Sequence, residues 1–253
     1  MSIRRIFNNH HWAGFASAVQ FLTIIPLRSG GVFDAGNSLA HYPLCGLLIG
    51  AVVLAVHLVS GYFWPPPVVG LLDVVCLAVI TGALHLDGLA DTADGLYGRR
   101  DPERALAIMK DSRIGAMGTA AMICCLTAKW AGLSQIPADR IFWLLLVPAY
   151  ARSSVLFGIR ALPYGRPDGG TGQAFFQNPI GFRDFWAVGL LLLLSLLSGW
   201  GVIVLNAGFA GITLVILWWY RRKIQCITGD MLGAMIEVTE TVLFLLCAAG
   251  ASL

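Results

Sequence analysis

The segment His85-Leu-Asp-Gly-Leu-Ala-Asp-Thr-Ala-Asp-Gly-Leu-Tyr-Gly-Arg-Arg100 joins two apolar runs of membrane length and concentrates charge in a chain that has little. If it is helical, Asp87, Asp91 and Asp94 are spaced i, i+4 and i+7, so their carboxylates share one face. Two unit charges about 6 Å apart repel by roughly 3 kcal/mol at an effective dielectric near ~20, so three carboxylates require a cation among them. An all-oxygen ligand set suits Mg²⁺ better than Zn²⁺. The segment therefore predicts a Mg²⁺ site held by these three aspartates.

Glycines and cations beside this face predict that it binds phosphate groups. Gly88 and Gly95 each follow an aspartate, where a missing side chain would let a phosphate or a metal-bound water approach the backbone. Each glycine costs about 1 kcal/mol of helix propensity, which suggests that the glycines serve a function at these positions. Three cations expected to neutralise nucleotide phosphates follow downstream: Arg99, Lys110 and Arg113. The alternative, a solvated helix whose charges pair with one another, fits poorly with three aspartates on one face and apolar flanks.

The composition excludes a soluble globular domain. Of the 253 residues, 57% are hydrophobic and only 12% are charged, and the mean hydropathy is +0.75. Backbone groups in hydrocarbon must bond within their own segment, and the apolar runs are about 20 residues long, so we predict an all-α transmembrane bundle and no barrel. The net charge of +3 gives no indication of nucleic-acid binding. Because no repeat or linker is evident, residues 1–253 are expected to form a single integral membrane catalytic domain.

We expect six or seven spans preceded by an N-terminal helix. Residues 12–27 form an apolar run shorter than a comfortable span, which predicts an interfacial or re-entrant helix, with a true span as the alternative. The Gly/Pro-rich residues 163–184 are too polar to cross, and they are expected to form either a mobile lid over the site or a plain connector. The expected spans are residues 42–63, 68–86, 116–136, 141–162, 185–205, 207–220 and 228–253.

Charged residues inside the apolar runs predict polar contacts within the membrane. Asp230, Glu237 and Glu240 share one helical face, and Arg152 lies within a span, where a charge costs about 2.5 to 3.5 kcal/mol on insertion scales. Since intramembrane charges are usually functional, we predict that Arg152, Asp230 and Glu240 bind substrate. Glu237 lies about 10 Å deeper than Asp230, at the level of a pocket beneath the metal. The alternative for Glu237 is a structural ion pair with Arg152 or Lys129.

The distribution of cations predicts the topology. One set of alternate loops carries Arg4, Arg5 and Arg28, the cluster from Arg99 to Arg113, Arg166 with Arg183, and Arg221 to Lys223, whereas the opposite set holds only Arg140. The positive-inside rule then places the N-terminus, the aspartate segment, residues 163–184 and Asp230 in the cytoplasm. All the predicted chemistry therefore faces one side.

Five blocks of sequence occur in the order found in a known family: Phe21-Leu-Thr-Ile-Ile-Pro26, Tyr42-Pro-Leu-Cys-Gly46, Leu86-Asp-Gly-Leu-Ala-Asp-Thr-Ala-Asp-Gly-Leu96, Ile108-Met-Lys-Asp-Ser-Arg-Ile-Gly115, and Thr228-Gly-Asp-Met-Leu-Gly-Ala234 with Glu237 and Glu240. With these blocks the chain resembles the cobalamin synthases, formally adenosylcobinamide-GDP ribazoletransferases. The resemblance implies a multi-pass enzyme of the cytoplasmic (inner) membrane that uses Mg²⁺. It implies the joining of α-ribazole, or its 5′-phosphate, to adenosylcobinamide-GDP with release of GMP, the step that completes adenosylcobalamin biosynthesis.

A weaker resemblance connects the chain to the CDP-alcohol phosphotransferases. Asp91-Thr-Ala-Asp-Gly-Leu-Tyr-Gly-Arg99 fits their signature D-x-x-D-G-x-x-A-R with Gly98 in place of alanine, but the glycine and paired aspartates expected downstream are absent. A lipid head-group phosphotransferase is therefore the alternative enzyme. The alternative of another class is an ion-coupled transporter with a path lined by intramembrane charges: Asp73, Arg152, Glu237 and Glu240. The dense acidic cluster at one helix end beside cations favours an enzyme.

The residues themselves also favour phosphoryl transfer. A cation held by the aspartate segment would bridge a diphosphate, and the downstream cations would neutralise charge on the nucleotide phosphates. A further carboxylate, either Asp111 or Glu237, would accept the proton of the attacking hydroxyl, so Asp94, Asp111 and Glu237 are the predicted catalytic residues. The sequence leaves open whether one or two metal ions bind, which acceptor is preferred and whether the protein forms a homo-oligomer.

Overall fold

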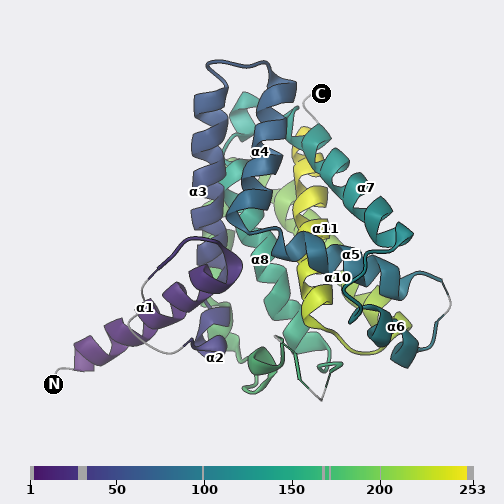
Figure 1. Ribbon diagram of the computed structural model, residues 1–253. Helices are drawn as coiled ribbons and strands as arrows, with labels where there is room; N and C mark the ends of the chain where they lie inside the picture. Colours follow the sequence, from purple (N-terminus) through teal and green to yellow (C-terminus); the bar gives the residue numbers. More distant parts are fainter. Residues whose placement is uncertain are drawn as a thin grey trace.

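The fold is described from a computed structural model that covers residues 3–27, 33–98, 100–166, 169–170, 172–199 and 201–249, with side chains from residue 11 onward. Within these ranges the chain forms only helices, turns and one isolated bridge between Tyr164 and Ile227, so the predicted all-α bundle is confirmed (Figure 1). The α-helices are α1 Ile3–Leu22, α2 Ala35–Leu39, α3 Tyr42–Ser60, α4 Pro66–Ile80, α5 Leu84–Leu96, α6 Pro102–Ile108, α7 Ala116–Leu133, α8 Trp143–Ala161, α9 Trp186–Ser195, α10 Gly201–Lys223 and α11 Gly229–Ala248.

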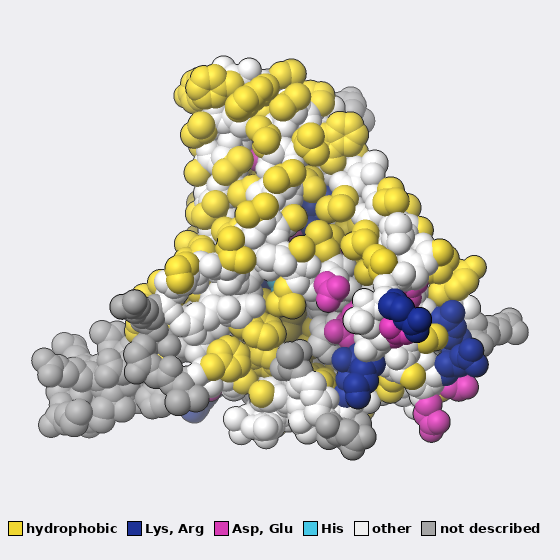
Figure 2. All heavy atoms as spheres, viewed as in Figure 1, with side chains coloured by type: hydrophobic (Ala, Val, Ile, Leu, Met, Phe, Trp, Pro, Cys, Tyr) yellow, Lys and Arg dark blue, Asp and Glu magenta, His cyan; other side chains and the backbone are white. Residues whose placement is uncertain are grey.

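Five of the described helices are long and apolar enough to cross a membrane: α3, α7, α8, α10 and α11. The bent pair α4 and α5 makes a sixth if it is counted as one span, so the predicted six or seven spans become five or six. Large apolar side chains such as Val79, Ile123 and Leu214 are exposed on these helices, and the upper part of the molecule presents an almost continuous apolar surface (Figure 2). The chain therefore has the helices of a multi-pass membrane protein.

Helix α1 lies obliquely at the base of the bundle (Figure 1) and is not among the candidate spans. This argues against the alternative of a true span, whereas the interfacial or re-entrant position stays a prediction, and α1 begins at Ile3 rather than at residue 12. Its last turn ends beside α3, where the ring of Phe21 lies 6.5 Å from that of Tyr42. The N-terminal helix thus reaches into the bundle at one end only.

The predicted span 68–86 is wrong at its second end, because α4 stops at Ile80 and α5 leaves at an angle of 89°. Gly82 and Ala83 both adopt left-handed backbone angles, with φ of 59° and 57°, which an α-helix cannot continue through. The carbonyl that α4 leaves free at Ile80 accepts the N–H of Ile24 at 2.8 Å. With α4 upright, α5 runs sideways below it toward α6 (Figure 1), so the aspartate segment is not part of the five spanning helices.

The predicted spans 185–205 and 207–220 also divide differently. The 10-residue α9 continues only as a short 3-10 helix, Leu196–Ser198, before Gly199 reverses the chain with a φ of 56°. Helix α10 then begins at Gly201 and runs for 23 residues. The sixth segment is therefore long enough to cross a membrane and the fifth is not among the candidate spans, because α10 begins at Gly201, six residues before the expected residue 207.

Helices α3 and α8 approach most closely at two glycines. A Cβ atom at Gly46 would lie 2.3 Å from the Cα of Ala149, and one at Gly50 would lie 2.4 Å from the carbonyl oxygen of Leu145. Small residues four positions apart let membrane helices pack backbone against backbone, which substitutes for the hydrophobic effect that lipid does not provide. This contact fixes α8, which is almost entirely buried at the centre of the bundle.

The loops that carry the predicted cytoplasmic cations meet at one end of the bundle. Lys223 donates to the carbonyl of Gly98 at 2.7 Å, and Arg221 donates to that of Ala161 at 3.1 Å. At the opposite end Arg140 donates to the carbonyl of Cys247 at 2.8 Å. Charged side chains gather around α5 and α6 (Figure 2), and we call this the polar end. The side chains of Arg4, Arg5 and Arg28 lie outside the described part.

We expect Gly46→Leu to destabilise the bundle, because the new side chain would overlap the α8 backbone. Overpacking of this kind typically costs about 1–3 kcal/mol. Thermal unfolding of the detergent-purified protein, followed by tryptophan fluorescence, measures the effect. Gly211→Leu is the matched control, since a Cβ at Gly211 of α10 meets nothing within 4 Å. Equal melting temperatures for the two variants would contradict the close α3–α8 contact.

Candidate active site

Helices α5 and α11 cross at two glycines, and this crossing assembles the site. A Cβ at Gly88 would lie 2.7 Å from the carbonyl oxygen of Asp230, and one at Gly233 would lie 3.3 Å from the Cα of His85. The close approach places Asp230, in the first turn of α11, in the same pocket as Asp87. Helix packing therefore accounts for Gly88. Gly88 also lines the pocket, so the approach of a phosphate to its backbone stays a prediction.

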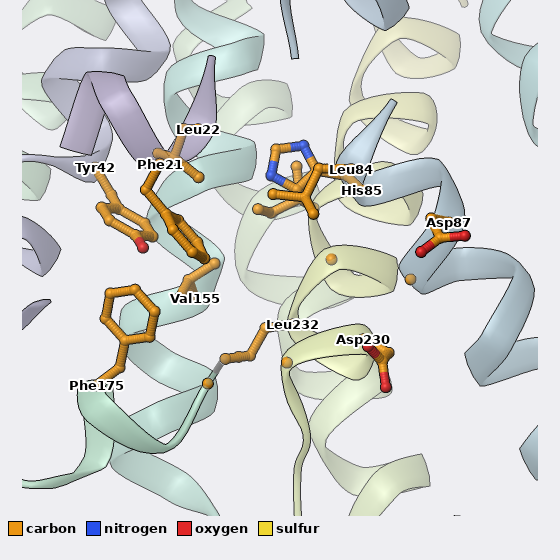
Figure 3. Close-up of a pocket in the computed structure, with 15 residues that line it drawn as sticks. Phe21, Leu22, Tyr42, Leu84, His85, Asp87, Val155, Phe175, Asp230 and Leu232 are labelled. Atoms are coloured by element: carbon orange, nitrogen blue, oxygen red, sulfur yellow. The ribbon is translucent and has the colours of Figure 1, made fainter. Parts of the chain in front are cut away.

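The crossing forms one wall of a pocket at the polar end (Figure 3). Asp87 and Asp230 lie on one side of this pocket, and the rings of Phe21, Tyr42 and Phe175 lie on the other. Its remaining lining comes from α1, α5, α8, α11 and the loop that follows α8. The residues that line the pocket thus come from segments far apart in the sequence.

Asp91, one turn along α5 from Asp87, completes an acidic cluster. Its pKa is raised from 3.8 to about 6, first by burial and then by the negative charges of Asp87, Asp230 and Asp94, while Arg166 opposes them. The repulsion predicted for the acidic face is therefore present. The members of the acidic cluster differ from the prediction, however, because Asp230 joins the cluster from another helix.

The last turn of α5 is held by its neighbours. The Asp94 carboxylate accepts the N–H groups of Gly115 at 2.7 Å and Gly118 at 2.9 Å, at the start of α7, where backbone donors are free and the helix dipole favours an anion. Gly95 packs against α6, because a Cβ there would lie 2.5 Å from the Cγ of Met109. Both oxygens of Asp94 thus have a structural task, and protein fills the space beside Gly95 where a phosphate was predicted.

Arg166 is a site residue that the sequence did not single out for chemistry. It donates to Asp230 at 2.7 Å from the loop after α8, and the bridge between Tyr164 and Ile227 holds this loop against the start of α11. The same loop supplies Gly172 and Phe175 to the pocket. Residues 163–184 therefore take part in the site, and the signal available in the sequence was a lone arginine among glycines and prolines.

Two of the three predicted phosphate-binding cations, Lys110 and Arg113, lie on the surface near the start of α7. Lys110 and Arg113 are exposed, and Arg113 forms a two-pronged contact with Asp111, with Nη2 to Oδ2 at 2.6 Å. This partner lowers the pKa of Asp111 to about 2, which makes it a weak proton acceptor. The pocket lining includes none of Lys110, Asp111 and Arg113. Arg99 lies outside the described residues.

The intramembrane acids form a buried ion network with two cations. The Lys129 Nζ lies 2.6 Å from Glu237 and 2.7 Å from Glu240, and Arg152 pairs with the other oxygen of Glu240. All four side chains are at most 5% exposed, and none lines the pocket. This geometry favours the structural alternative for Glu237. Arg152 and Glu240, for which substrate contacts were predicted, are likewise absent from the pocket lining.

The donor set of the acidic cluster fits a hard cation with a substrate bound. In the described part of the chain, no group of three His, Cys, Asp or Glu side chains is placed to hold a metal ion, so the predicted cage of three aspartates is not assembled. Mg²⁺ commonly takes one or two carboxylates and completes its shell with waters and substrate phosphates. Asp87 and Asp91 supply such a pair, and a cation would relieve the repulsion among these carboxylates, which adds to burial in raising the pKa of Asp91.

The sequence is similar to proteins of one family over nearly its whole length. Residues 14–248 match the CobS family, described as cobalamin-5-phosphate synthase. Among similar proteins, each named adenosylcobinamide-GDP ribazoletransferase, that of Geotalea daltonii is 36% identical over 88% of this chain and 92% of its own. That of Acetivibrio thermocellus is 34% identical over 90% and 94%, and that of Pseudomonas putida W619 is 38% identical over 89% and 94%. No solved structure matches the chain.

In metal-free buffer we expect Asp91 to lower stability as the pH rises from about 4 to about 6. Its folded-state pKa of about 6 exceeds the unfolded value of 3.8, so the folded protein holds the additional proton in this range and loses it at higher pH. Melting temperatures measured with a chelator present test this. Asp91→Asn should flatten the profile, whereas Asp101→Asn, an exposed helix cap, should not. An unchanged slope in Asp91→Asn would contradict the burial of this carboxylate.

We expect Lys129→Met to destabilise the protein strongly, because it leaves Glu237 buried without its cation. Breaking one side of a buried pair typically costs about 3–5 kcal/mol. Adding Glu237→Gln should recover part of the loss, which a double-mutant cycle of melting temperatures measures. Arg160→Met, which changes an exposed cation of α8, is the control. A Glu237→Gln variant with normal stability but no turnover would instead support the catalytic role predicted for Glu237.

Proposed function

Because the chain belongs to the CobS family of cobalamin-5-phosphate synthases, we propose that it joins α-ribazole, or α-ribazole 5′-phosphate, to adenosylcobinamide-GDP with release of GMP. One observation carries the proposal beyond the family. Asp87 and Asp91 of α5 and Asp230 of α11 form an acidic cluster, two of whose members line a pocket at the polar end, and Arg166 lies beside them. This is the mixture of charges that a metal-bound diphosphate requires.

In this proposal Asp87 and Asp91 hold Mg²⁺, which supplies Lewis-acid stabilisation of the diphosphate when it is bound. Arg166, released from Asp230, neutralises charge on the phosphate at which transfer occurs. Lys110 lies on the exposed loop before α7, where it would contact the guanosine phosphate, and Arg113 would do so after leaving its partner Asp111. Asp94 holds α7 against α5 and so keeps this loop beside the acidic cluster.

The transfer exchanges one phosphate–oxygen bond for another. A ribose hydroxyl of the acceptor forms a bond to the phosphorus attached to cobinamide, and the bond from that phosphorus to the bridging oxygen breaks, so GMP leaves with that oxygen. Asp230 is the carboxylate placed to accept the hydroxyl proton, since it lines the pocket on a different helix from the metal-binding pair. Neither Asp111 nor Glu237 lines the pocket, which favours Asp230 over both.

We further propose that the protein lies in the inner membrane with its polar end on the cytoplasmic side. Its loops carry Arg100, Arg104, Lys110, Arg221 and Lys223, and the opposite end carries only Arg140 among the described cations. Both substrates are large and polar, so they would reach a site at this end without entering hydrocarbon. The bilayer is then the structural partner of the enzyme, and the substrates meet it from one side.

We expect Asp87→Asn and Asp91→Asn each to lower kcat/KM at least about a hundredfold, because an amide is nearly isosteric but cannot supply the charge that holds Mg²⁺. Protein in lipid nanodiscs, with adenosylcobinamide-GDP, α-ribazole and Mg²⁺, is scored for GMP release. The control Asp101→Asn should retain full activity.

The same assay separates the proposal from its alternative. Release of CMP from CDP-linked donors with a lipid acceptor, and no release of GMP, would contradict the proposed ribazole transfer. It would instead support the alternative, a lipid head-group phosphotransferase. Full activity in both aspartate variants would contradict the metal site while leaving the family assignment intact.

A further inference from the structure

The pocket at the polar end has an aromatic side that the proposed phosphoryl chemistry does not use. Three rings from separate segments meet there, with the Phe21 and Phe175 centroids 4.9 Å apart in an edge-to-face arrangement and the Tyr42 and Phe175 centroids 6.1 Å apart. Val155 and Leu232 extend the apolar lining (Figure 3). A surface of this kind favours a flat, largely apolar ring over a phosphate or a sugar.

His85 lies between the aromatic side and the carboxylates and lacks a hydrogen-bond partner. Its side chain lines the pocket (Figure 3), it is 3% exposed, and neither ring nitrogen bonds to any described residue. Arg152, Glu240 and Lys129 act on it electrostatically but do not bond to it. A buried polar group without a partner is costly, so such a group that lines a cavity points to a ligand that supplies the missing bond.

We propose that this side of the pocket binds the base of the acceptor nucleoside, and that His85 donates a hydrogen bond to the free ring nitrogen of that base. The inference rests on the proposed function, which makes a ribazole-type nucleoside the acceptor. A benzimidazole base is flat and apolar, and it keeps one unsubstituted ring nitrogen, which can only accept. An imidazole N–H supplies the matching donor.

The geometry favours this base over the other ring system among the substrates. Guanine carries several donors and acceptors along its edges, and the aromatic side offers it only the imidazole and the Tyr42 hydroxyl. With the benzimidazole packed against these rings, the ribose would extend toward Asp87 and Asp230, which lie on the opposite side of the pocket (Figure 3). His85 is then a specificity-determining residue that places the attacking hydroxyl, and it is not a catalytic group.

The test compares α-ribazole with its indole analogue, in which a C–H replaces the free ring nitrogen. For the wild-type enzyme with adenosylcobinamide-GDP and Mg²⁺, we expect kcat/KM to be at least about tenfold higher for α-ribazole, because a site built for a hydrogen bond discriminates against a substrate that lacks it. His85→Leu should reduce this ratio to about one by raising KM for α-ribazole alone. His85→Gln, which keeps a donor, should retain part of the preference.

Binding without turnover gives a second readout. Calorimetric titration of α-ribazole into the metal-free protein should show a Kd about tenfold weaker for His85→Leu than for wild type, at an unchanged melting temperature. His11→Leu changes a histidine outside this pocket and should leave both measurements unchanged.

The outcomes distinguish the two proposals. A wild-type protein that releases no GMP with either acceptor refutes the proposed function. A wild-type enzyme that works, together with a His85→Leu variant that keeps the full preference for the ring nitrogen, refutes the base subsite alone. If His85→Leu does not fold, the wild-type ratio still decides, because a wild-type ratio near one would itself contradict a hydrogen bond to the base.

Discussion

The buried ion network of Lys129, Glu237, Glu240 and Arg152 is the constraint on which the bundle depends. Two cations and two carboxylates lie inside α7, α8 and α11, where an unpaired charge would be strongly destabilising, so each must find its partner on another helix. Apolar packing in lipid is weakly directional, because the chain and the solvent are equally apolar. The network therefore specifies how these three helices are rotated and how far each is inserted, and the close contact of α3 with α8 adds a fourth helix.

Because the ion network fixes the position of α11, it also fixes the end of α11 that lies at the polar end. Glu237 and Glu240 anchor its middle, and Asp230 lies two turns earlier on the same rigid element. The glycine crossing with α5 then brings the aspartate segment to Asp230. The intramembrane acids thus support the site by positioning a helix. They do this without touching the pocket, which explains how charges deep in the bundle serve chemistry at its surface.

The sequence predicted much of the site because its main signal is local. The spacing of Asp87 and Asp91 along α5 places them on one face whatever the tertiary structure. Other roles depended on contacts that the spacing does not contain. Asp94 has the same periodicity, yet it turns to the free N–H groups of α7, and Gly88 makes room for a neighbouring helix. His85 and Arg166 belong to no sequence pattern that indicates a function, so only their positions in the tertiary structure identify them as site residues.

By itself the sequence determined that the chain is helical and membrane-bound, and that its charges gather at one end, because apolar length and the cost of unpaired backbone groups in lipid allow few other structures. The tertiary structure decided where helices end and which charges pair. The two left-handed residues Gly82 and Ala83 turn α5 sideways from α4, and Glu237 meets Lys129 rather than a substrate. Both outcomes depend on atoms more than 50 residues apart in the chain, since Ile24 caps α4 and Lys129 faces α11, and no local pattern records such contacts.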